Sequence, residues 1–174
     1  MSGLIVVDAA LADVDALVHA AAEYLARRLG GTPPLDPEAL PTDAAGALAG
    51  IDAWAGDDVA NWRAELTRWF EAHAPVMLVP DPDLNAQLRR AAKAGRHLAV
   101  ASALPAVPLD LALQHLGCAR AFTAACAGDG SLDDALTLAQ AALIGLIVLK
   151  ERLRGIQYAG LVLVVLAVIG LSLG

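Results

Sequence analysis

The chain has 174 residues, of which 57% are hydrophobic, and its formal net charge is −7 at pH 7. That length accommodates one ordinary domain and an appendage. Residues 1–140 hold eighteen of the nineteen acidic side chains but only nine of the twelve basic ones. Because nucleic-acid binding needs a basic surface, we expect no nucleic-acid partner.

The first predicted elements are a buried strand and an amphipathic helix. Residues 4–8 form a β-branched apolar run that ends in Asp8, which is typical of a strand in a parallel sheet. The run is too short for the apolar part of a signal peptide, and we expect none. In residues 15–29 apolar side chains recur every three or four positions, which predicts a helix ending at Gly30.

The next segment is predicted to be a loop and a second long helix. Residues 32–50 are rich in Pro, Asp and Ala and indicate a loop with one short helix. A helix is expected over residues 57–73, ended by Pro75. Trp62 and Trp69 lie seven residues apart on it, a spacing that favours a packed stripe over an aromatic binding box.

Alternating helices and strands follow. We expect helices over residues 81–94 and 108–116, and buried strands over residues 97–102 and 122–127. Strand, helical insertion, helix, strand, helix, strand is the order of a doubly wound α/β domain with a parallel sheet.

The C-terminal part is the most apolar. A helix is predicted over residues 133–149, whose apolar core, residues 136–149, would span about 21 Å, less than the ~30 Å hydrocarbon core of a bilayer. Residues 156–174 carry no charge and would span roughly 28 Å as a helix. We expect this segment to be a membrane anchor; a buried core helix is the alternative.

The charges beside the anchor predict its orientation. Lys150, Arg152 and Arg154 immediately precede it, and basic residues that flank a span stay on the cytoplasmic side. We therefore expect a membrane-associated protein whose globular domain is cytoplasmic.

Residues 4–127 resemble the haloacid dehalogenase-like superfamily of phosphatases and hydrolases. The likeness is carried by Asp8 after the first strand, a helical segment of cap size at about residues 14–79, and Ser102 after the second strand. It implies a Rossmann-like parallel sheet with a helical cap insertion in residues 1–135, followed by hydrophobic helical segments in residues 136–174. It also implies that Asp8 and Ser102 lie side by side at the carboxyl ends of their strands, where the family places its nucleophile and its phosphoryl-binding hydroxyl.

The chain departs from the family's catalytic motif, Asp-x-Asp-Gly-Thr. Ala10 stands in place of the second Asp, which is the general acid and base of the family, and no Lys follows the third strand. Asp13 and Asp15, like the pair Asp133-Asp134, are expected to be carboxylates at helix starts. A carboxylate that attacks a phosphate dianion without a compensating cation faces strong repulsion. We therefore expect no catalysis and no cofactor; Mg²⁺ is expected only if the chain is a hydrolase after all.

Cysteine and histidine offer no further site. Cys118 and Cys126 form no Cys-x-x-Cys pair and are expected to be buried free thiols. The four histidines lack metal-ligand spacing, and no metal site is expected. They are His19, His73, His97 and His115.

A second resemblance covers residues 141–173, which look like the last helix pair of drug/metabolite (EamA-type) transporters. There a helix ends in Gly-Glu-Arg-Leu; here Lys150 replaces the Gly. Two helices cannot form that family's substrate path, so the likeness supports membrane insertion and not transport.

Three functional hypotheses remain open. The first is a degenerate, membrane-associated protein of haloacid dehalogenase type that acts as a binding or scaffold module. The second is a phosphomonoester hydrolase whose missing groups are unconventional or come from a partner. The third is a small component associated with membrane transport, which would dock on a protein partner through its hydrophobic helices.

Overall fold

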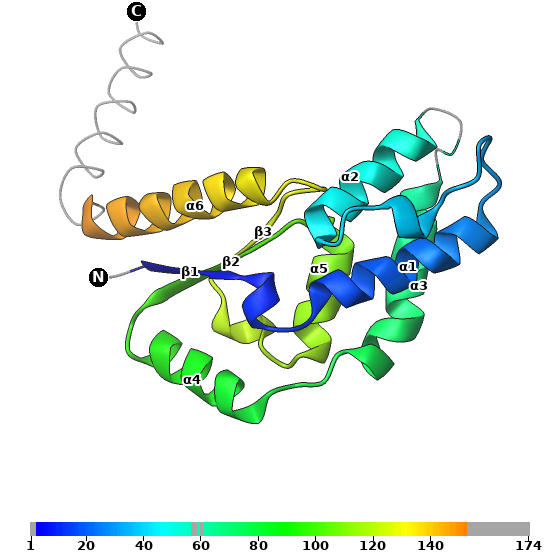
Figure 1. Ribbon diagram of the computed structural model, residues 1–174. Coiled ribbons are helices and arrows are strands. Elements are labelled where there is room, and N and C mark those ends of the chain that lie inside the picture. The colour runs from blue at the N-terminus through cyan, green and yellow to red at the C-terminus, as the bar shows by residue number, and fades with distance from the viewer. Residues whose placement is uncertain (1–2, 57–58, 60, 153–174) are drawn as a thin grey trace, which may run out of the picture.

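The computed structural model describes residues 3–56, 59 and 61–152 (Figure 1). Three parallel strands form one sheet in the order β1 (Gly3–Val7), β2 (His97–Ser102) and β3 (Ala124–Ala127). The predicted α/β class with a parallel sheet is therefore confirmed. The third strand starts two residues later than expected, and just before it Thr123 donates its backbone N–H to the Leu98 carbonyl at 2.7 Å.

Helices make up most of the rest of the described chain. The long ones are α1 (Val14–Arg28), α2 (Ala44–Ala55), α3 (Trp62–Met77), α4 (Pro82–Lys93), α5 (Ala106–His115) and α6 (Leu132–Arg152). Three short 3₁₀ turns, η1 (Asp8–Ala10), η2 (Pro37–Ala39) and η3 (Ala119–Ala121), lie between them. The segment expected as an insertion, residues 14–79, thus contains α1, α2 and α3.

The central strand β2 divides the molecule into two apolar layers. All six of its residues are buried, and alternate side chains point to opposite faces. Leu98 and Val100 belong to the larger core, whereas Ala99 and Ala101 belong to a smaller one. Both faces of β2 are therefore covered, as expected for a parallel sheet.

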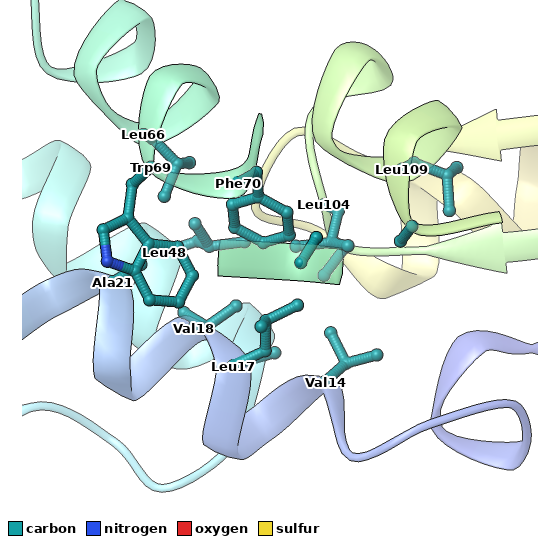
Figure 2. Close-up of a cluster of buried hydrophobic side chains, with 14 of the residues drawn as sticks. Val14, Leu17, Val18, Ala21, Leu48, Leu66, Trp69, Phe70, Leu104 and Leu109 are labelled. Carbon is teal, nitrogen blue, oxygen red and sulfur yellow. The ribbon is translucent and has the colours of Figure 1, made fainter. Parts of the chain in front are cut away.

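The larger core joins α1, α2, α3 and α5 to one face of the sheet. Figure 2 shows Phe70 and Leu66 of α3 above Leu17 and Val18 of α1, with Leu104 beside them. Trp62 and Trp69 are buried, so the predicted packed stripe is confirmed. Helices α1, α2 and α3 thus share this core with the sheet and form one of the layers that cover it.

Helix α6 covers the opposite face (Figure 1). Ala135, Ala139 and Leu143 are buried against Ala99, Ala101 and Cys126. The helix begins at Leu132 and runs through the boundary expected at residue 135. No helix within the described part of the chain is long and apolar enough to span a bilayer. The predicted anchor, residues 156–174, lies outside the described residues.

Two local predictions are wrong. Residues 44–55 form the twelve-residue helix α2, longer than the short helix expected in this loop. Pro75 does not end α3, which continues to Met77. A proline this close to a C-terminus removes one main-chain hydrogen bond, and the turn still closes because Leu78 N–H donates to the Ala74 carbonyl at 2.9 Å.

Candidate functional site

The candidate site lies at the carboxyl ends of β1 and β2, where open α/β sheets place their ligands. Val7 pairs with Ala101, so the next residues along the two parallel strands, Asp8 and Ser102, are neighbours. The adjacency expected from the sequence is therefore present. What the two side chains can do chemically depends on their surroundings.

Both carboxylate oxygens of Asp8 accept hydrogen bonds from the protein. Oδ1 accepts from the backbone N–H of Ala9 at 2.8 Å, and Oδ2 accepts from the Ser102 hydroxyl. The main-chain carbonyl of Asp8 also accepts from Leu11 N–H at 2.7 Å, which closes the turn η1. The side chain is thus held by the turn that follows its own strand and by the neighbouring strand.

Ser102 has no exposed surface and bridges two segments. Its hydroxyl donates to Asp8, and its oxygen accepts the backbone N–H of Leu104 at 3.0 Å. Its carbonyl accepts from Gly128 N–H at 2.8 Å, in the loop after β3. These bonds tie together the chain segments that leave the three strands.

The environment of Asp8 disfavours its charge. Its exposed fraction is 8%, and this burial raises the pKa of the carboxyl above its ordinary value of 3.8. The hydrogen bonds from Ser102 and Ala9 lower the pKa without offsetting the burial, and repulsion from Asp15 raises it further. Within the described part of the chain, no basic side chain forms an ion pair with Asp8.

The other acidic residues close to Asp8 in the sequence have structural partners. Asp13 caps α1 by accepting Ala16 N–H at 3.0 Å, and Asp15 accepts Ala44 N–H at 2.7 Å, at the start of α2. Both belong to the start of a helix, as predicted. Asp133 and Asp134 likewise lie in the first turn of α6.

One basic side chain reaches the loop after β3, and the sequence did not point to it. Arg63, in the first turn of α3, forms ion pairs with Asp129 of that loop and, at 3.1 Å, with Asp52 of α2. The cation at this loop comes from α3 and is already paired with two carboxylates.

Two cavities formed by described residues lie elsewhere. One of about 330 Å³ lies between the start of α1 and the end of α3, with Ala12, Asp13 and Met77 in its lining. The other, of about 610 Å³, lies between α4, the end of α5 and η3. Neither lining includes Asp8 or Ser102.

Cysteine and histidine form no further site in the described part of the molecule. Cys118 and Cys126 are free and buried, as predicted, and burial raises the pKa of both thiols. No group of three or more metal-binding side chains gathers among the residues described by the structure. His97 is buried, and its Nε2 has no hydrogen-bond partner among the described residues.

Comparisons with protein-family models, with curated proteins and with solved structures find no match for this chain.

Proposed function

We propose that residues 1–135 are a catalytically silent domain of haloacid dehalogenase type, with a helical cap insertion at about residues 14–79, and that the protein is a membrane-associated binding or scaffold module. The observation that supports this proposal is the environment of Asp8. Its carboxyl is buried and hydrogen-bonded through both oxygens, with no cation beside it among the described residues.

Phosphoryl transfer depends on positioning and charge neutralisation. An attacking carboxylate must be ionised and must lie about 3–3.5 Å from the phosphorus. Burial disfavours the ionised form of Asp8, and neither of the two cavities reaches it. Ala10 has no proton to give to a leaving group, which removes a contribution of about 10²–10⁴-fold. In this proposal the Asp8–Ser102 bond is a structural link between strands.

A second candidate is a phosphomonoester hydrolase, and the position of Asp8 beside Ser102 at the carboxyl ends of β1 and β2 favours it. In a hydrolase, the buried Asp8 would have to become accessible to the substrate. Arg63 would also have to leave Asp52 and Asp129 to neutralise a phosphate. Mg²⁺ would then have to be held by Asp8 and by groups from outside this domain.

Binding of Mg²⁺ distinguishes the two candidates. The full chain is titrated with Mg²⁺ by calorimetry, with and without beryllium trifluoride as a phosphate analogue. The scaffold proposal predicts no heat that depends on Asp8. An isotherm that appears with the analogue and disappears in Asp8→Asn would support the hydrolase.

The membrane part of the proposal rests on the sequence of residues 156–174, which are uncharged and apolar. An epitope at residue 1 and protease treatment of sealed spheroplasts test the orientation. We expect the epitope to be protected and the protein to resist extraction by carbonate. Digestion from outside would refute the cytoplasmic assignment, and release by carbonate would refute the anchor.

A further inference from the structure

The basic side chains of residues 1–140 fall into two groups, those with and those without a carboxylate partner. Four of the nine in residues 1–140 form ion pairs with carboxylates: Arg27, Arg28, Arg63 and Arg68. The other five have no carboxylate partner among the described residues: Arg89, Arg90, Lys93, Arg96 and Arg120. All five belong to α4, the turn that follows it, or η3. Uncompensated positive charge is therefore concentrated in one region of an acidic molecule.

This region contains the cavity of about 610 Å³, which we call the basic cleft. Three of the five unpaired cations line it: Arg89 and Lys93 from α4, and Arg120 from η3. The amide side chains of Asn85 and Gln114 contribute to the wall, and no carboxylate does. The volume lies in the range of about 300–1,000 Å³ that is usual for small-molecule sites.

The spacing along α4 explains why these side chains face the cleft together. Asn85, Arg89 and Lys93 are four residues apart and therefore form one row on the helix. Arg90 is displaced from that row by about 100° around the helix and does not line the cleft. It is a cation on the same helix that points elsewhere, which makes it a matched control.

The opposite wall is fixed to α4 by an interaction that needs no ligand. The Asn85 side chain donates to the Leu116 carbonyl at 2.7 Å, at the end of α5. Gly117 then turns the chain with a φ of 72°, a conformation that favours glycine, and the buried Cys118 directly precedes η3. Gln114 is oriented by a 2.6 Å hydrogen bond to Asp110, which is not part of the lining. The cleft is thus formed before anything binds.

A purely structural role accounts for only part of this arrangement. Basic residues in the last turn of α4 interact favourably with the helix dipole, which suits Arg90 and Lys93. The dipole of α4 does not explain Arg120, which comes from η3. Like charges four residues apart, such as Arg89 and Lys93, also weaken a helix. An anion between them would remove this repulsion.

We propose that the basic cleft binds a phosphoryl group with at least two negative charges, as in a phosphomonoester or a pyrophosphate. Two guanidinium groups can each donate two parallel hydrogen bonds to phosphate oxygens, and a lysine adds a third charge. The cleft adjoins the segments that lead into β2 and β3 and so lies near the amino ends of these strands, whereas Asp8 and Ser102 lie at the carboxyl ends of β1 and β2. The proposal is therefore independent of the function proposed above.

Calorimetric titration of the full chain with pyrophosphate tests the cleft. The variants Arg89→Gln and Arg120→Gln should each weaken binding about tenfold or more, because each removes a charge-assisted contact. Arg90→Gln makes the same charge change on α4 outside the lining and should alter the dissociation constant by about twofold or less, as long-range effects of exposed charges are screened.

A second arm identifies the source of the phosphoryl group. Binding of the chain is compared on phosphatidylcholine vesicles with and without a phosphoinositide. Binding of pyrophosphate that depends on Arg89 and Arg120 supports a soluble ligand. A phosphoinositide effect with the same dependence, without pyrophosphate binding, supports a lipid headgroup. If the chain neither binds pyrophosphate nor responds to the phosphoinositide, the proposal is overturned. It is also overturned if Arg90→Gln weakens binding as much as Arg89→Gln and Arg120→Gln do, because the effect would then come from net charge and not from the cleft.

Discussion

The Ser102 hydroxyl donates a hydrogen bond to the Asp8 carboxylate, although the two residues are 94 positions apart in the chain. Both groups are buried, and the bond joins the carboxyl ends of β1 and β2. A buried serine–carboxylate bond stabilises the fold whether or not any ligand binds. Its consequences for stability can therefore be measured separately from any activity.

Replacing Asp8 by Asn should change how stability depends on pH. The folded-state pKa of Asp8 is raised above 3.8, so its contribution is fully present below about pH 3.8 and is lost as the pH rises through the folded value. We expect Asp8→Asn to gain stability relative to the wild type between pH 4 and pH 7. Urea unfolding across this range checks the sign, with Glu23→Gln correcting for net charge. If the wild type instead gains stability relative to Asp8→Asn as the pH rises, burial is not the dominant influence on the pKa of Asp8.

Replacing Ser102 by Ala should destabilise the protein by about 1–3 kcal/mol, because Leu104 N–H and the Asp8 carboxylate both lose a buried partner. Urea unfolding at pH 7 measures the loss. In the Asp8→Asn background the loss should be smaller, since no charged carboxylate is left unpaired. A loss below about 0.5 kcal/mol would mean that water replaces the hydroxyl.

Glu65 provides a test of a buried carboxylate in the helical layer that pairs with two exposed arginines. Its carboxylate is 6% exposed, accepts from Tyr24 at 3.2 Å, and pairs with Arg28 and Arg68. Glu65→Gln should cost about 1 kcal/mol or more, because hydrogen bonds to charged groups are the stronger ones. Glu23→Gln, which removes an exposed pair with Arg27, should change stability by about 0.5 kcal/mol or less. Equal losses of thermal stability in Glu65→Gln and Glu23→Gln would contradict the expectation that the buried carboxylate contributes more than the exposed one.

Two glycine substitutions test the loop that ties β3 to Ser102. A Cβ at Gly128 would overlap the Ser131 carbonyl, so Gly128→Ala must shift the backbone that bonds to Ser102. We expect a loss of about 2 kcal/mol or more. Gly30→Ala meets nothing within 4 Å and should be neutral or stabilising by up to about 1 kcal/mol. Comparable melting temperatures for the two variants would show that the loop adjusts freely.

Local patterns in the sequence predicted the sheet and the adjacency of Asp8 and Ser102. Strand β2 matches its predicted bounds because a run of four apolar residues, 98–101, follows shortly after the helix-ending Gly95. The sequence did not predict the full length of α2, although its buried positions recur at helical spacing. Its many alanines and glycines make the buried and exposed faces of the helix hard to tell apart in the sequence. The Arg63–Asp129 pair joins residues 66 positions apart and leaves no local signal. The basic cleft was missed for the same reason, since Arg120 meets α4 only in the folded chain.

The central claim is that the site formed by Asp8 and Ser102 is catalytically silent. It is tested most directly by measuring the turnover of a generic phosphomonoester in the presence of Mg²⁺. The full-length wild type and Asp8→Asn are assayed side by side, after unfolding measurements have shown that both are folded. We predict identical rates, and Ala10→Asp should not raise them because charge neutralisation is still missing. A clear Mg²⁺-dependent rate in the wild type that Asp8→Asn abolishes would contradict the account.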